Sequence, residues 1–167
     1  MMGRGAAATT GNTGFTLIEL MITLVVLGIV VTLGVPQFNA FITNQQAKTA
    51  SQSLYSSLTH ARSEAIREND SAAVEAIGDD WNRGWIVLNA NGEELRRVEN
   101  ENGAWRIAVA PSGSSRLEFQ RNGRADNRLR FQVCGRGQST AVTERIVGVD
   151  LTGRPSLALG DTCDGET

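Results

Sequence analysis

Few side chains in this 167-residue chain are of types that carry covalent chemistry. It has one histidine, His60, and two cysteines, Cys134 and Cys163. One imidazole is too few for a histidine-rich metal site, and no spacing supports Cys134 with His60 as a thiol–imidazole pair. The chain has no Walker motif, and no Gly-x-Gly-x-x-Gly follows a strand pattern. We therefore predict that the protein is not an enzyme and has no catalytic residue, no cofactor and no small-molecule substrate.

The acidic residues do not form a metal-binding pattern either. Asp79-Asp80 and Glu93-Glu94 lie at expected turns, where carboxylates are usually solvated. Asp161, Asp164 and Glu166 are oxygen donors of the kind that Ca²⁺ takes, but they lack the spaced loop that a calcium site needs. We predict no metal site.

One carboxylate, Glu19, stands in an unusual place. It is the only charged residue between positions 15 and 35, a run long enough to span about 31 Å as a helix, close to the ~30 Å bilayer core. A charge in such a segment calls for a partner. One interpretation is a capping box with Thr16 as N-cap. The other is a functional acid whose counter-charge comes from another molecule.

The residues around Glu19 carry a resemblance to a known family. Residues 14–20 read GFTLIEL, which resembles the processing site of type IV pilins and type II secretion pseudopilins. The resemblance implies that a prepilin peptidase cleaves between Gly14 and Phe15 and that the new amino-terminal Phe15 is N-methylated. Counted from Phe15, Glu19 is the fifth residue and Pro36 the twenty-second, where the family keeps its glutamate and often a helix-bending proline. The leader departs from the family pattern in having Arg4 as its single, distant cation.

This resemblance also implies a place in the cell and a set of partners. Glu19 of one subunit would neutralise the Phe15 amine of the next, an attraction that is strong in a low-dielectric environment. The partners would be other minor and major pilins or pseudopilins, the prepilin peptidase and the inner-membrane assembly platform. The chain would cross the inner membrane once, with its head in the periplasm, and then join a pilus or pseudopilus.

A helical pattern continues beyond Pro36. Small apolar residues recur at spacings of three or four from Ala47 to Ala65, which predicts one helix from about Phe15 to about Glu68. Pro36 should bend this helix, and the alternative is two helices with a break there. The predicted division of the chain is a cleaved leader, a membrane or filament-core helix, an amphipathic helix and a β-rich head, at residues 1–14, 15–35, 36–69 and 70–167.

Composition and turn chemistry define the fold class of the head. With 41% hydrophobic and 20% charged residues, the chain is neither wholly disordered nor collagen-like. Short alternating runs separated by turns such as Asn91-Gly92 and Asn122-Gly123 predict antiparallel hairpins. The fold class is α+β, a long N-terminal helix packed on one or two antiparallel sheets. The predicted strands are 72–77, 85–89, 95–98, 105–110, 116–120, 128–134 and 145–150.

The head carries a second resemblance. Residues 81–85 read WNRGW, similar to the Trp-x-x-Gly-Trp element of the GspH/FimT group of minor pilins and pseudopilins, although two aromatic residues anchoring a turn explain it more simply than a ligand site. Residues 119–124, 131–134, 145–147 and 153–155 follow the C-terminal pattern of that group. The resemblance implies a structural subunit that primes or joins assembly of a type IV pilus, or of a type II secretion pseudopilus.

The two cysteines allow one intramolecular pair. If the head lies outside the cytoplasm, a disulfide between Cys134 and Cys163 is permitted and would pin the C-terminal tail onto a strand. A paired cysteine near the C-terminus resembles the FimT/FimU minor pilins more than the secretion pseudopilins. A free buried thiol and an intermolecular bridge are the alternatives.

The arginines suggest an alternative function, DNA capture for natural transformation. Charge changes sign along the chain: residues 64–101 hold ten acids against four arginines, and residues 116–154 hold eight arginines against four acids. Arginine neutralises phosphates, but it also forms solvated faces and ion pairs. DNA-binding members of the group resemble each other in a Gly-Arg-x-Arg element, and here Gly153 and Arg154 are not followed by the second arginine. The candidate DNA contacts are Arg121, Arg124, Arg128, Arg130, Arg136 and Arg154.

Overall fold

The computed structural model describes residues 15–136 and 143–163, with residues 33–37 and 162 as backbone only. The predicted leader lies outside the described residues. The chain divides into two units, Met1–Gln37 and Phe38–Thr167. We call the second unit the head.

The longest element is α1 (Leu17–Glu68), a helix of 52 residues. Its bounds lie within two residues of the predicted ones. Pro36 lies inside this one helix, so the alternative of two helices with a break at Pro36 is wrong. Asn69 adopts a φ of 53°, and the Asp70 N–H donates to the Ala65 carbonyl at 3.1 Å. A left-handed residue with such a bond is a common way for a helix to end. The bend at Pro36 stays a prediction.

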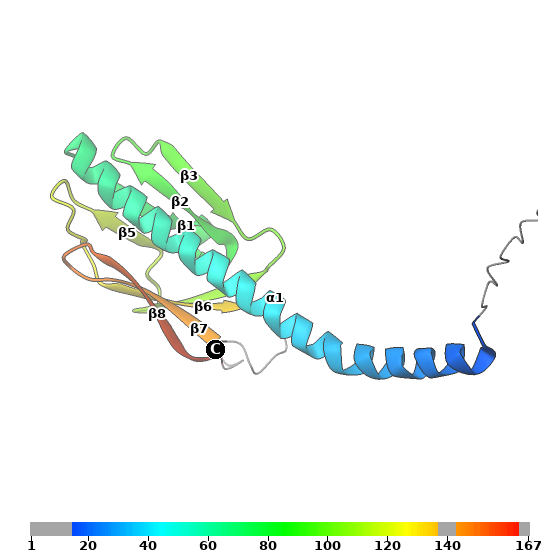
Figure 1. The fold of residues 1–167 in the computed structure, drawn as a ribbon. Coiled ribbons are helices and arrows are strands. Elements are labelled where there is room, and N and C mark those ends of the chain that lie inside the picture. The colour runs from blue at the N-terminus through cyan, green and yellow to red at the C-terminus, as the bar shows by residue number, and fades with distance from the viewer. Residues whose placement is uncertain (1–14, 137–142, 164–167) are drawn as a thin grey trace, which may run out of the picture. The chain divides into compact units, whose positions relative to one another are not determined.

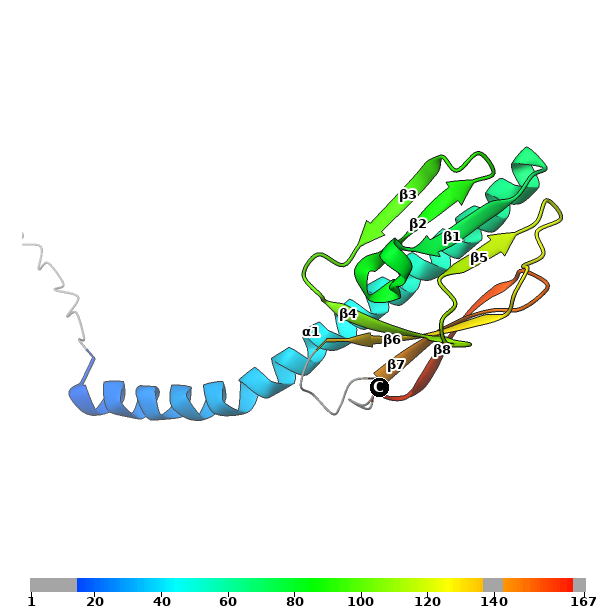
Figure 2. The same cartoon turned by 180° about the vertical axis from the view of Figure 1, so that it is seen from behind.

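The rest of the head is built from eight strands in two antiparallel sheets (Figures 1 and 2). The sheet orders are β3-β2-β1-β5 and β4-β6-β7-β8. The strands are β1 (Ala72–Ala76), β2 (Gly84–Asn89), β3 (Glu94–Glu99), β4 (Trp105–Ala110), β5 (Arg116–Phe119), β6 (Leu129–Gly135), β7 (Thr143–Val149) and β8 (Pro155–Thr162). The α+β class and the seven predicted strands are confirmed.

Three elements were not predicted. These are β8 and two short 3-10 helices, η1 (Ile77–Asp79) and η2 (Trp81–Arg83), which connect β1 to β2. The alternation of Leu157 and Leu159 after the Thr152-Gly153 turn was a signal for β8. It is weak because the intervening residues are small rather than polar.

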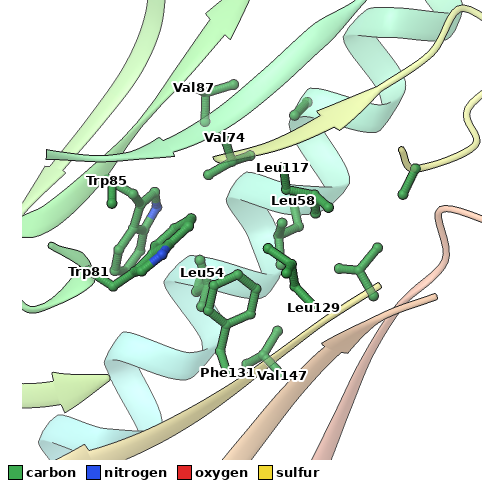
Figure 3. Packing of buried hydrophobic residues seen from close by; sticks show 14 of the residues in the cluster. Leu54, Leu58, Val74, Trp81, Trp85, Val87, Leu117, Leu129, Phe131 and Val147 are labelled. Atoms are coloured by element: carbon green, nitrogen blue, oxygen red, sulfur yellow. The ribbon is translucent and has the colours of Figure 1, made fainter. Parts of the chain in front are cut away.

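The core lies between α1 and both sheets. Figure 3 shows Leu54 and Leu58 of α1 pointing toward side chains of both sheets, among them Leu117 of β5 and Phe131 of β6. The small-residue stripe predicted on the helix is at most 1% exposed throughout, from Ala47 to Ala65. Small side chains let the helix axis approach the sheets closely, so the stripe sets how tightly the layers pack.

Close contacts define two ends of the head. At the Gly135 end, β6 approaches α1 so closely that a Cβ on Gly135 would overlap the Thr43 carbonyl. At the Gly123 end, Gly123 lies against Ile66 near the end of α1, and Gly153 has no room for a Cβ beside the Gly123 carbonyl. Within the head, α1 therefore runs from the Gly135 end to the Gly123 end.

Candidate functional site

The first described residues form a helix with no apolar partner of its own. Large hydrophobic side chains from Phe15 to Val31 are between 52% and 86% exposed, on all sides of the helix. Within the part of the chain that the structure describes, no helix is long and apolar enough to cross a membrane. Globular proteins rarely expose contiguous apolar patches of this size unless another surface covers them. The segment is thus the clearest candidate for contact outside the chain.

The polar groups of this segment are satisfied within the helix. The Thr23 hydroxyl donates to the Leu20 carbonyl at 2.8 Å, and the Thr32 hydroxyl donates to the Gly28 carbonyl at 2.7 Å. Such bonds back to the preceding turn remove the hydroxyl donors from the surface of a helix. The segment therefore presents apolar side chains with few unsatisfied donors.

Glu19 is the exception in this segment. Its backbone N–H donates to the Thr16 hydroxyl at 3.3 Å, so the N-cap half of the predicted capping box forms. Among the described residues, no cation and no hydrogen-bond donor contacts its carboxylate, and the side chain is exposed. The two interpretations of Glu19 are compatible, because the N-cap bond to Thr16 uses the Glu19 backbone N–H and does not involve its carboxylate.

The two tryptophans of the WNRGW element are structural. The Trp81 indole N–H donates to the Ser114 carbonyl at 2.7 Å, and its ring meets Phe131 edge-on at 4.7 Å. The Trp85 indole N–H donates to the Ser57 hydroxyl of α1 at 2.9 Å. Both side chains are at most 3% exposed. Because the rings are buried and the donors are satisfied, the element anchors the turn into the core and offers no open face to a ligand.

The structure joins Cys134 and Cys163 in a disulfide, with the two Cα atoms 6.0 Å apart. Neither of the alternatives, a free thiol or an intermolecular bridge, is found. The bond ties the end of β8 to β6, two strands that β7 separates in the sheet. Closing a loop of this length lowers the entropy of the unfolded chain by an amount worth about 3–4 kcal/mol.

The six candidate arginines do not form one patch. Arg121, Arg124 and Arg154 lie on the two turns that meet at Gly123 and Gly153. Arg128 directly precedes β6 and Arg130 is its second residue, whereas Arg136 follows its last residue, beside the Gly103 turn. Arg128 and Arg136 flank the seven residues of β6, and eight residue steps along a strand span roughly 26 Å. The predicted cluster is thus divided between the two ends of the head.

Acidic residues accompany the arginines at the Gly123 end. Arg121 shares a shallow hollow with Asp70. The hydrogen bond from the Thr152 hydroxyl, helped by the charge of Arg128, holds the pKa of Asp150 below its ordinary value. Asp126 lies on the same loop as Arg124 and stays exposed. The local charge at this end is therefore mixed.

The remaining chemical candidates stay apart. His60 is exposed on α1. Within the described ranges, no three His, Cys, Asp or Glu side chains come together as metal ligands. Asp161 is exposed near the end of β8, and Asp164 and Glu166 lie outside the described residues.

Comparison with known proteins agrees with this description. Residues 50–153 match the family described as type II transport protein GspH, and residues 10–35 match the prokaryotic N-terminal methylation motif. No curated protein matches the chain by sequence.

Solved structures share the fold. The type IV minor pilin FimU of Pseudomonas aeruginosa is 23% identical in two crystal forms, with TM-scores of 0.59 and 0.56. These matches cover 72% and 70% of this chain and 96% and 99% of FimU. The minor pseudopilin EpsH of the Vibrio cholerae type 2 secretion system is 19% identical, with a TM-score of 0.49 over 68% of this chain and 96% of EpsH. Because the GspH match spans more than half of its length and the methylation motif precedes it, this chain belongs to the GspH family of minor pilins and pseudopilins.

Proposed function

We propose that this chain is a membrane-anchored filament subunit that primes or joins assembly of a type IV pilus or a type II secretion pseudopilus. The observation that carries the proposal is the segment from Phe15 to Val31, whose large apolar side chains are exposed on all sides and which lies inside the methylation-motif match. Such a surface needs lipid before assembly and the helices of neighbouring subunits afterwards. The likeness of the Cys134–Cys163 pair to the FimT/FimU proteins favours the pilus.

The proposed life of the subunit begins in the inner membrane, with one crossing and the head in the periplasm. The prepilin peptidase removes residues 1–14, and Phe15 gains a methyl group on its amine. The assembly platform then transfers the subunit to the filament, where Glu19 meets the Phe15 amine of the adjacent subunit.

Intact mass measurement tests the processing step. We expect the full chain, produced together with a prepilin peptidase, to lose residues 1–14 and to gain one methyl group at Phe15. A Gly14→Val variant should stay uncleaved, because a branched side chain then flanks the scissile bond. Gly11→Val places the same change three residues earlier and should be cleaved normally. A mature protein that begins at another residue would contradict the assignment.

The alternative function, DNA binding for natural transformation, rests on the five exposed candidate arginines at or next to the Gly123 end. Asp70, Asp126 and Asp150 lie among them, and Arg136 is at the other end, so we expect weak attraction for phosphates. A gel shift with the head, residues 38–167, should show no retardation of double-stranded DNA at about 0.15 M salt. Retardation that weakens with salt and disappears in the Arg121→Ala, Arg124→Ala double variant would favour DNA capture.

A further inference from the structure

Exposed hydrophobic side chains of the head gather on two of its parts. Beyond the first residues of the head, 38–42, the described residues expose five large ones, which are Tyr55, Ile66, Leu151, Leu157 and Leu159. The first two lie on α1 and the other three on the hairpin of β7 and β8. Among the described residues of β1 to β6, no large hydrophobic side chain is exposed. Folded domains rarely expose several large apolar side chains on one side unless another surface covers them.

The core face of the second sheet continues onto β8 without a cover. Val147 pairs with Leu157, and Arg145 pairs with Leu159. Residues that pair across antiparallel strands point to the same face, and Val147 is a fully buried core residue. Leu157 and Leu159 therefore point to the core side of the sheet, yet they are 43% and 66% exposed. This face is covered as far as β7 and open at β8.

One flank of α1 borders the open face. Near the start of the head, the Asn44 side chain accepts from the Thr143 N–H of β7 at 3.0 Å. Further along α1, Arg62 lies against Gly123, in the turn beside the β7–β8 hairpin. Tyr55 is eleven residues after Asn44 and seven before Arg62, about three and two whole turns of helix. It therefore lies between these contacts on the flank that faces β7 and β8.

Three cations lie on this side of the head. Lys48 is four residues after Asn44 on the same flank of α1, Arg62 lies further along it, and Arg145 lies on β7. Among the described residues, none of these three cations has an ion-pair or hydrogen-bond partner. The Nε atoms of Arg62 and Arg145 are buried without an acceptor. Buried donors in folded proteins are nearly always satisfied, so these two guanidinium groups indicate an acceptor that the described head does not supply.

The carboxylates nearby do not provide that acceptor. Glu144 lies against Gly160, on the face of the sheet opposite Arg145. Asp150 accepts hydrogen bonds within its own turn, and Asp161 lies at the far end of β8, past a shift in its pairing with β7. The region is therefore both apolar and cationic. We call it the α1–β8 surface, and its residues are Lys48, Tyr55, Arg62, Arg145, Leu157 and Leu159.

We propose that the α1–β8 surface binds a segment of a different pilin-class subunit that carries apolar side chains and at least one carboxylate. The carboxylate would pair with Arg145, and the apolar side chains would cover Leu157 and Leu159. The inference rests on the proposed function, because it takes the partner from the same filament or pseudopilus.

Charge argues against two other occupants. Two copies that met through this surface would bring like charges together, which costs free energy. The acidic part of the head from Glu75 to Glu101 exposes no large hydrophobic side chain, so a second copy offers no matching segment there. An anionic membrane surface fits less well than a protein segment, because Arg62 and Arg145 are half-buried and an inserted side chain reaches them better than a flat surface does.

Photo-crosslinking tests the occupant. The full chain, with p-benzoylphenylalanine in place of Tyr55, is produced in cells with the pilin-class subunits of its own genome. We expect a cross-link to a different pilin-class subunit, located by mass spectrometry in a segment with apolar residues and an Asp or Glu. The same group in place of His60, on the far side of α1, should not give this cross-link. A cross-link to a second copy, to lipid or to a segment without a carboxylate would overturn the proposal.

Arg145→Met removes the charge and keeps an unbranched side chain. It should lower the yield of the position-55 cross-link by at least about tenfold, because the partner's carboxylate loses its cation. No contact within the described head is lost, so the unfolding midpoint of the full chain in detergent should not fall. Arg116→Met is the matched control, since Arg116 pairs with Glu75 and Glu118 on the other sheet and should leave the yield unchanged. An unchanged yield in Arg145→Met, or a lower midpoint together with a lower yield, would count against the proposal.

Two substitutions of one exposed residue test the sign of the charge. Leu159→Asp and Leu159→Lys remove the same apolar contact, and Leu159 is exposed enough for both variants to fold. Against an acidic partner, the aspartate variant should give a cross-link yield at least about tenfold below that of the lysine variant. Equal yields would overturn the proposal, and so would the absence of a cross-link while the wild-type chain is in filaments. If the wild-type chain does not enter filaments at all, the proposed function fails and the α1–β8 surface fails with it.

Discussion

Replacing Glu19 by valine is expected to leave cleavage and methylation intact while lowering incorporation into filaments by about a hundredfold or more. Removing one partner of a buried ion pair costs roughly 3–5 kcal/mol, and each 1.4 kcal/mol is a factor of ten. In the membrane before assembly, the same substitution lowers the free energy of the subunit, because valine is easier to bury in lipid than a carboxylate. The substitution therefore stabilises the unassembled subunit and destabilises the filament. The amount of the chain in sheared filaments measures incorporation, and intact mass measures cleavage and methylation.

A second variant separates charge pairing from helix capping. Thr16→Val removes the hydroxyl that accepts the Glu19 N–H, which costs about 1 kcal/mol of helix stability, and leaves the carboxylate in place. Incorporation should fall far less than in Glu19→Val. Equal losses in the two variants would favour the capping interpretation, and normal filament numbers in Glu19→Val would refute the charge-pairing account.

Trp85→Ala should be the most damaging single change among the core substitutions considered, lowering the free energy of unfolding by about 3–5 kcal/mol. Trp85 is fully buried, its ring lies 6.1 Å from that of Trp105, and its N–H donates to Ser57 of α1. The change opens a cavity between β2 and the helix and removes a hydrogen bond that joins them. Urea denaturation of the head, residues 38–167, with its disulfide intact, measures the loss.

Two companion variants resolve the causes of this loss. Ser57→Ala keeps the ring but leaves a buried indole N–H without an acceptor, which should cost about 1–3 kcal/mol. Tyr55→Ala removes a 38% exposed aromatic ring from the same helix and should change stability by no more than about 1 kcal/mol. A Trp85→Ala head as stable as the Tyr55→Ala head would show that the WNRGW element does not anchor the fold.

Features with a local physical cause were predictable. The small-residue stripe from Ala47 to Ala65 has the spacing of one helix face, and all of it is buried. Turn dipeptides such as Asn122-Gly123 place Gly123 at a φ of 74°, which glycine adopts without strain. Each of these signals depends on residues within a few positions of one another, so no distant contact was needed to interpret it.

Features that depend on distant contacts were not predictable. The sequence alone suggested one cluster of arginines, but β6 carries Arg136 to the opposite end of the head from Arg121. β8 was not predicted because the alternation of its apolar and small residues is weak, and only its pairing with β7 shows that it is a strand.

The sequence by itself determined the processing motif, the apolar segment with its single carboxylate, the long helix and the α+β class. All of these follow from residue types at short spacing along the chain. Only the tertiary structure decided how the outer edges of β4 and β5 are closed. Asn82 of η2 must reach β4 to accept from the Ile107 N–H, and Asp126 must fold back on β5 to accept from the Glu118 N–H. An edge is a property of strands that pair, and pairing is set by packing over the whole head.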